Sequence, residues 1–207
     1  MGKPERMHQV YELITKDKES KIVVLSALSG TTNALVDISN SLSAGNKSEA
    51  KQKIDTLEAH YHAFVLDLLK TEALIAKGNA IVKEHFEFLN IITKISFSDA
   101  LNKDILAQGE LMSTKLFCCY LEQQGQDHLL LPALDFMVLD QNEEPNLPLI
   151  RTKLTALLAA HSDKTIFITQ GYICKNVRGE VDNLKRGGSD YTASLVDDAC
   201  NASVCEL

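Results

Sequence analysis

The chain has 207 residues, 45% of them hydrophobic and 24% charged, so it can form one large hydrophobic core or two small ones. Its formal net charge of −7 and the lack of a sustained Lys/Arg block argue against a nucleic-acid partner or an anionic membrane surface. The first ten residues, MGKPERMHQV, lack the apolar core of a signal peptide, and no apolar run is long enough to span a bilayer. We therefore expect a cytoplasmic protein.

The cysteines and histidines predict neither a disulfide framework nor a metal site. The cysteines are odd in number and form no Cys-x-x-Cys pair, so we expect reduced, partly buried thiols. His60 and His62 are two positions apart on an expected helix and therefore point in different directions. No spacing of Ser, His, Asp or Cys suggests a covalent nucleophile.

The first predicted unit is a strand, a loop of small residues and a helix. Residues 21–26 (KIVVLS) form a β-branched apolar run, and residues 27–33 have turn and cap chemistry. The helix follows from Ala34, with one of three residues as its N-cap: Thr31, Thr32 or Asn33. Free N–H groups at the start of this helix predict an anion site, although a simple capped turn explains the same residues and no Walker-type ending is present.

The middle of the chain predicts mainly helices. Residues 48–97 contain no Pro and carry apolar side chains at helical spacing, which predicts an all-helical insertion. A further helix is expected from the Ser98–Asp99 cap to about Gly125. The apolar run 128–139 predicts a strand that is broken by Pro132.

The last third predicts a return to alternating elements. We expect a helix over residues 149–160, a buried strand over 165–169, and a β-hairpin over 170–184 with Gly179 at its turn. A final helix is expected to begin just after Arg186. Because we find no internal repeat and no low-complexity linker, the sequence predicts one α/β domain with a helical insertion.

Glu110 is the first candidate for chemistry outside the loop. Its neighbours on the same helical face are mostly small or apolar: Leu106, Ala107, Ser113, Thr114 and Phe117. A carboxylate on such a face is costly unless it is paired, so it meets either a cation of the protein or a ligand ammonium group. The pattern alone also allows a solvated position at the edge of the helix.

Residues 185–190 (KRGGSD) give the strongest local signal. Two glycines remove side-chain bulk beside Arg186, whose guanidinium fork matches a carboxylate or phosphate, and Ser189 lies where a helix begins. A Gly-Gly turn with a Ser or Asp cap explains the same residues equally well.

Four ordered motifs closely resemble those of aspartate kinases, and the similarity runs over residues 2–196. The motifs are VVLSA at 23–27 with Gly30, Thr32 and Asn33; GELMST at 109–114; FITQGY at 167–172; and RGGSDYTA at 186–193. The resemblance implies a three-layer α/β/α sandwich of the amino acid kinase (carbamate kinase-like) fold.

The family transfers the γ-phosphoryl group of ATP, as a magnesium complex, to the β-carboxylate of L-aspartate. This is the first step of lysine, threonine and methionine biosynthesis, and the full-length enzymes form homo-oligomers. The resemblance therefore implies ATP, Mg²⁺ and L-aspartate as ligands, with no dedicated protein site for the metal. Phosphoryl transfer needs positioning and charge neutralisation more than a covalent nucleophile, so the missing triad is no objection.

The resemblance also implies a role for individual residues. Glu110 would receive the α-ammonium group of aspartate, Arg186 would clamp a substrate carboxylate, and Asp190 would orient a phosphate-binding lysine. The remaining implied positions are substrate-binding Ser26, Thr32, Tyr172 and Ser189, and Gly187 and Gly188 near the phosphates.

The chain departs from the family pattern at both ends. It begins after the family's Lys-Phe-Gly-Gly strand and stops before the Trp-Thr-Asp segment, so we expect residues 1–207 to be a partial catalytic domain without the ATP-binding half or the regulatory domains. Two alternatives remain open. One is a catalytically inactive fragment that binds aspartate or a partner subunit. The other is a different enzyme of the same fold, acting on acetylglutamate, glutamate, carbamate or a nucleoside monophosphate.

Overall fold

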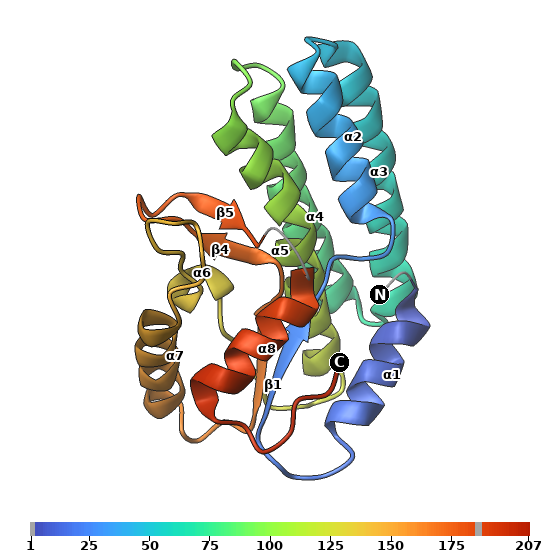
Figure 1. The fold of residues 1–207 in the computed structure, drawn as a ribbon. Helices are drawn as coiled ribbons and strands as arrows, with labels where there is room; N and C mark the ends of the chain where they lie inside the picture. Colours follow the sequence, from blue (N-terminus) through green and yellow to red (C-terminus); the bar gives the residue numbers. More distant parts are fainter. Residues whose placement is uncertain (1–2, 185–187) are drawn as a thin grey trace.

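The computed structural model describes residues 3–184 and 188–207 (Figure 1). The helices are α1 (Pro4–Ile14), α2 (Thr31–Ser43), α3 (Lys47–Leu68), α4 (Glu72–Ile92), α5 (Asp99–Gln123), α6 (Ala133–Phe136), α7 (Leu147–Ala160) and α8 (Gly188–Cys200). The strands are β1 (Lys21–Leu25), β2 (Leu129–Leu130), β3 (Ile166–Gln170), β4 (Ile173–Lys175) and β5 (Val181–Asn183).

The central sheet is parallel and has the strand order β1-β3-β2. Val23 of β1 lies opposite Ile168 of β3, and Leu130 of β2 lies on the other side of the same residue. A separate antiparallel hairpin, β4-β5, follows directly after β3. Parallel strands need helical crossovers, and α2 to α5 supply the long connection from β1 to β2.

Alternation along the strands divides the core into two clusters, one on each face of the sheet. Val23, Leu25, Ile166 and Ile168 belong to the cluster shared with α2 to α5. Their strand neighbours Ile22, Val24 and Phe167 belong to the cluster shared with α7 and α8. Because successive side chains point to opposite faces, one short sheet holds two helical layers together. The arrangement is the predicted α/β/α sandwich.

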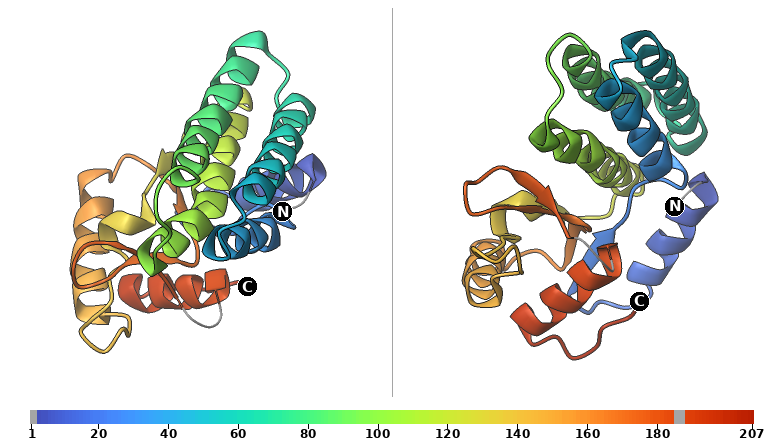
Figure 2. Two further views of the ribbon diagram at one scale, coloured as in Figure 1. Left: turned by 90° about the horizontal axis from the view of Figure 1, so that it is seen from above. Right: turned by 45° about the horizontal axis from the view of Figure 1, so that its top comes forward.

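Helices α2 to α5 form the larger layer. They pack in the order α2-α3-α4-α5, and α5 closes back onto α2. Both views in Figure 2 show this layer (blue to green) as an elongated bundle on one side of the sheet, with α8 (red) on the other. Two of its helices begin at side-chain caps, since the Ser98 hydroxyl accepts a hydrogen bond from the Leu101 N–H of α5 and Thr71 caps α4 in the same way.

Several expected elements are found within a few residues of their predicted bounds. The strand at 21–26, the helix from Ser98, the strand at 165–169 and the hairpin with Gly179 at its turn are confirmed. The stretch 48–97 is mostly helical as expected, but it consists of two helices, because the chain leaves the helical conformation at Leu69 and restarts at the Thr71 cap.

Two local predictions need correction. The strand in the run 128–139 is broken at Pro132 as expected, but it consists only of the two residues of β2, because Pro132 leads into the short helix α6, whose Ala133 N–H donates to the Gln170 side chain. The first helix after β1 is not capped by Thr31, Thr32 or Asn33. It begins at Thr31 after Gly30, which has φ 84° and no side chain to cap with.

Within the described ranges, no helix combines the length and the apolar character needed to cross a membrane.

Candidate functional site

The candidate site lies where the carboxyl ends of β1 and β3 meet. The Gly171 N–H, just after β3, donates to the Leu25 carbonyl at the end of β1, over 2.9 Å. Ser26 directly follows β1 and Tyr172 is the second residue after β3, so both lie at the carboxyl edge of two adjacent strands. Such an edge is where open α/β sheets bind ligands. Helix α5 brings Glu110 to this edge from one layer, and α8 brings Ser189 from the other.

Glu110 is buried at the centre of this edge, with only 4% of its surface exposed. Its Oε1 accepts a hydrogen bond of 3.3 Å from the Ala27 N–H. Its Oε2 is buried and has no hydrogen-bond partner among the described residues. Burial raises the pKa of Glu110 to about 7, although N–H donors of Glu110 and Ala27 favour the charged form. The site therefore holds a carboxyl group that lacks a counter-ion in the part of the chain that is described.

Two serine hydroxyls join the layers beside Glu110. The Ser26 Oγ donates to the Ser189 Oγ over 2.8 Å, which links the end of β1 to the first turn of α8. Ser26 is exposed and Ser189 is half-buried. The Ser113 Oγ donates to the Ser26 carbonyl over 2.8 Å, so α5 fixes the backbone at Ser26.

Tyr172 follows at the turn between β3 and β4. Its φ of 67° lies in the left-handed region, which is uncommon for a residue with a side chain. Its N–H donates to the Thr192 Oγ1 of α8 over 2.9 Å. Burial raises the pKa of the half-buried Tyr172 phenol, and the nearby charges of Glu110 and Asp182 raise it further. The phenol ring therefore belongs to the surroundings of Glu110.

Close backbone approaches explain two glycines of the motifs. A Cβ on Gly171 would lie 2.2 Å from the Ser189 Oγ, so no larger residue fits there without displacing α8. A Cβ on Gly109 would lie 2.8 Å from the Ala27 Cβ, so α5 packs directly on the loop that follows β1. These contacts set how closely Glu110 approaches the two strand ends.

A second row of polar residues supports the site and was not predicted from the sequence. The Gln170 Nε2 donates to the Thr114 Oγ1 over 2.8 Å, and the Thr114 Oγ1 donates to the Glu110 carbonyl over 2.8 Å. The Ala133 N–H donates to the Gln170 Oε1 over 2.8 Å. Thr114 was recognised only as a neighbour of Glu110 on the helix, and nothing in the local sequence connects it to Gln170.

The structure brings together Ser26, Glu110, Tyr172 and Ser189, and it leaves other predicted residues at the margin. Thr32 is exposed in the first turn of α2, whereas the preceding Thr31 is buried and shares a hydrogen bond of 3.0 Å with the Tyr61 hydroxyl. Asp190 is exposed in the first turn of α8, and Gly188 begins that helix with φ 49°. The positions predicted at Arg186 and Gly187 lie outside the described residues.

Residues 3–184 and 188–207 contain no group of three or more His, Cys, Asp and Glu side chains that could hold a metal ion. The cysteines are all free thiols in the structure, and burial raises the pKa of Cys118 and of Cys174 to about 12. Neither thiol is therefore an activated nucleophile.

Comparisons with known proteins identify the family and the fold. The model of the amino acid kinase family matches residues 1–207. Lysine-sensitive aspartokinase 3 of Escherichia coli is 29% identical over 98% of this chain, which covers 45% of that protein. The structure of E. coli aspartokinase III in complex with aspartate and ADP is similar, with a TM-score of 0.83, 27% identity, and coverage of 98% of this chain and 45% of that one.

The complex of the same E. coli enzyme with lysine and aspartate has a TM-score of 0.81 at 27% identity, and the match covers 96% of this chain and 44% of that one. The chain thus spans less than half the length of these aspartokinases. The predicted fold class is confirmed. The match of the family over all 207 residues, with aspartokinases as relatives in both sequence and structure, shows that this chain belongs to the amino acid kinase family.

Proposed function

We propose that this chain forms the aspartate-binding part of an aspartate kinase catalytic domain, which transfers the γ-phosphoryl group of ATP to the β-carboxylate of L-aspartate. The observation that carries the proposal is the buried Glu110 Oε2, which has no partner among the described residues. A buried carboxylate oxygen without a partner is costly, and a ligand ammonium group would compensate it. The α-ammonium group of an amino acid supplies such a cation.

The other groups at the site suit the rest of that ligand. Ser26 and Ser189 present hydroxyls next to the N-terminus of α8, where free N–H groups and the helix dipole favour negative charge. A carboxylate would accept hydrogen bonds there while the ammonium group contacts Glu110. The Glu110 carboxylate and the positive N-terminus of α8 together suit a zwitterion with a second carboxylate. Arg186, predicted as a further carboxylate ligand, remains a proposal.

Binding would also change the protonation of Glu110. Its pKa of about 7 means that the free site is partly protonated at neutral pH. A ligand ammonium group beside it would lower that pKa and release the proton. Glu110 would then act as a fixed charge that orients the amino acid, and not as a general base. No base is needed, since the β-carboxylate of aspartate is already ionised at neutral pH.

The residues of this chain would contribute to phosphoryl transfer by orientation. The attacking oxygen belongs to the substrate, so the pocket has to hold that carboxylate in line with the γ-phosphate and exclude alternative poses. Magnesium would enter with ATP as part of the nucleotide substrate. A relative of known structure binds aspartate and ADP, which supports the same pair of ligands here. Cytoplasmic location, a place in amino-acid biosynthesis and assembly as a homo-oligomer are parts of the same proposal.

Calorimetric titration of the purified chain with L-aspartate, and separately with magnesium-ATP, tests this function. We expect saturable binding of aspartate that Glu110→Ala and Arg186→Ala abolish. The matched control is Glu122→Ala. This variant removes an exposed carboxylate of α5, the helix of Glu110, which pairs with Lys77 of α4. Absence of aspartate binding by the folded wild-type chain, or wild-type affinity in Glu110→Ala, would overturn the proposal.

A further inference from the structure

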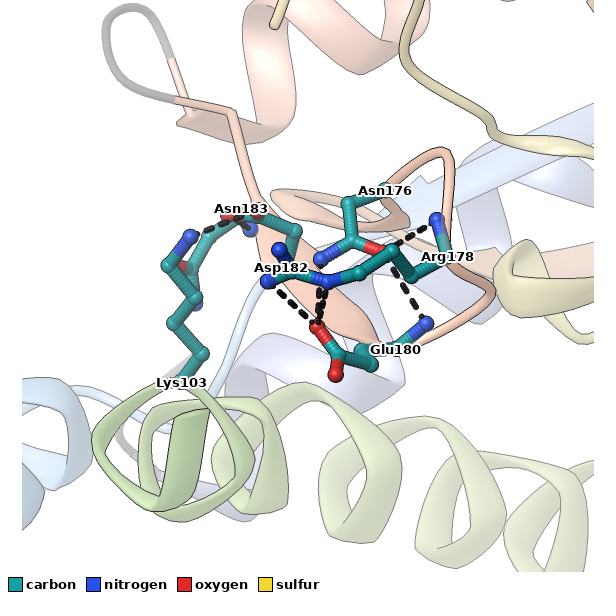
Figure 3. A network of polar contacts seen from close by, with 6 residues as sticks. All are labelled: Lys103, Asn176, Arg178, Glu180, Asp182 and Asn183. Atoms are coloured by element: carbon teal, nitrogen blue, oxygen red, sulfur yellow. Dashed lines mark hydrogen bonds and ion pairs between the residues drawn. The ribbon is translucent and has the colours of Figure 1, made fainter. Parts of the chain in front are cut away.

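A half-buried ion pair joins α5 to the hairpin β4-β5. The Lys103 Nζ donates to the Asp182 Oδ2 over 2.5 Å. Figure 3 shows Lys103 reaching from α5 to Asp182, beside the network of Asn176, Arg178 and Glu180. The Asp182 side chain is only 8% exposed, whereas that of Lys103 is 34% exposed. The carboxylate therefore depends on Lys103 for charge compensation far more than an exposed partner would.

The charged side chains next to this ion pair, Arg178 and Glu180, are bonded to each other. Glu180 accepts hydrogen bonds of 2.9 Å from the Asn176 Nδ2 and from the Arg178 Nε. The second oxygen of Asp182 accepts a hydrogen bond of 2.8 Å from the Asn183 N–H. Asp182 thus connects to α5 through Lys103, while its remaining contact stays within the hairpin.

The hairpin in turn holds Tyr172. In the β4-β5 ladder Ile173 lies opposite Asn183, one residue beyond Asp182. The Leu184 N–H donates to the Tyr172 carbonyl over 2.8 Å. Tyr172 has a left-handed backbone, and the preceding Gly171 lies so close to α8 that an added Cβ would be 2.2 Å from the Ser189 Oγ. Because the Tyr172 carbonyl is bonded to Leu184, a displacement of the hairpin would also move Tyr172.

Helix α5 carries both Lys103 and Glu110. Lys103 and Glu110 are seven residues apart, so they lie on the same side of α5 about two turns from each other. We propose that the Lys103–Asp182 ion pair is a positioning contact that sets the distance between Tyr172 and Glu110 and thereby the affinity for aspartate. This proposal rests on the proposed function, because it assigns a role in binding to residues that do not touch the ligand.

Removal of the cation is expected to weaken aspartate binding without abolishing it. In Lys103→Met, the buried Asp182 carboxylate loses its counter-ion, so the hairpin shifts toward solvent and carries Tyr172 with it. We expect the Kd for L-aspartate to rise on the order of tenfold. Lys103→Arg keeps the charge and is expected to bind within about twofold of the wild type. The exchanged pair, Lys103→Asp with Asp182→Lys, should recover most of the lost affinity.

The test is calorimetric titration of L-aspartate into wild-type chain and these variants, with Lys77→Met as the matched control. Lys77 pairs with Glu122 between α4 and α5, away from the hairpin, and its loss should leave the Kd unchanged. If Lys103→Met does not fold, Asp182→Asn provides the same comparison with an isosteric side chain. The proposal is overturned if Lys103→Met or Asp182→Asn binds like the wild type, or if neither Lys103→Arg nor the exchanged pair retains affinity. A wild-type chain that binds no aspartate would instead overturn the proposed function, and the positioning role with it.

Discussion

Two ionisable side chains are buried along α5 in opposite ways. His85, packed from α4, is 5% exposed, and both of its ring nitrogens have partners: Nδ1 lies 2.6 Å from the Gln108 Oε1, and Nε2 lies 3.0 Å from the Lys115 Nζ. Glu110, two residues beyond Gln108, is buried to a similar degree but has only one of its carboxyl oxygens bonded within the described chain. Both ring nitrogens of His85 have partners within the chain, whereas one carboxyl oxygen of Glu110 has none among the described residues.

The contrast separates a structural polar group from a binding group. Four buried side-chain atoms have no partner in the described part of the chain, and the other three belong to neutral side chains: Asn90, Thr169 and Asn183. Glu110 is the ionisable member of this set, and it lies beside two serine hydroxyls at the edge of the sheet. Burial alone therefore does not mark a site, but burial combined with an unpaired charged oxygen does.

The largest effect on stability is expected at Gly171, which packs against Ser189 at the candidate site. In Gly171→Ala the new Cβ would lie 2.2 Å from the Ser189 Oγ and 2.7 Å from its Cα, so α8 must move. We expect the free energy of unfolding to fall by about 3 kcal/mol in urea titrations. The double variant with Ser189→Gly should recover part of that loss. Equal stability of Gly171→Ala and wild type would show that Gly171 is not tightly packed against Ser189.

Glu110→Gln is expected to stabilise the unliganded chain. Folding raises the pKa of Glu110 from about 4.5 to about 7, so the folded state binds more protons between these pH values. The contribution of protonated Glu110 to the free energy of unfolding is therefore fully present below pH 4.5 and is lost as the pH rises through 7. Chemical unfolding should therefore show a gain of about 2 kcal/mol for the variant at pH 8 and almost none at pH 4. Lower stability of the variant at pH 8 would mean that the carboxylate is compensated in the free chain.

His85 is expected to give the opposite dependence on pH. Burial lowers its pKa below the ordinary value of 6.5, so the folded state binds fewer protons than the unfolded chain, and stability decreases as the pH falls below 6.5. Protonation would also place a second cation beside Lys115. His85→Gln should reduce the loss of stability between pH 7 and pH 5, as chemical unfolding at the two pH values would show. The control is exposed His60→Gln, and identical pH profiles for His85→Gln and the wild type would contradict the assignment.

The smallest effect is expected at Tyr61 of α3, whose hydroxyl is bonded to Thr31 in the first turn of α2. Its hydroxyl is fully buried and bonded to the Thr31 Oγ1, so Tyr61→Phe leaves a hydroxyl without its partner. Thermal unfolding should report a loss of about 1 kcal/mol. The exposed Tyr191→Phe is the matched control and should change stability by less than about 0.5 kcal/mol. An equal loss of stability in Tyr191→Phe and Tyr61→Phe would contradict the contribution of the Tyr61–Thr31 hydrogen bond.

The sequence predicted much of this region because its signals are local. The apolar run before Ser26, the position of Glu110 among small residues on one helical face, and the glycines beside Ser189 each follow from spacing within a few residues. The pairing of Gln170 with Thr114, and that of Lys103 with Asp182, joins residues 56 and 79 positions apart. Such contacts depend on how the layers pack, which no local pattern specifies.

Local patterns also failed where tertiary contacts decide the outcome. Residues 128–139 have the composition of a strand, yet after Pro132 the chain forms the helix α6, whose Ala133 N–H is bonded to the Gln170 side chain of β3. Glu110 could have been solvated or buried by its pattern, and only the packing of Gly109 against Ala27 places it in the interior. The motifs indicate a candidate site, and the packing determines which of its buried groups have partners among the described residues.

The central claim is that the unpaired oxygen of Glu110 receives an ammonium group. The most direct measurement compares L-aspartate with succinate, which lacks that group, in titrations of the wild type and Glu110→Gln at pH 8. We expect the substitution to weaken aspartate binding on the order of 100-fold and to change succinate binding by less than about threefold, because a charge-assisted hydrogen bond is lost in only one case. Equal losses for both ligands, or no loss for aspartate, would contradict the claim.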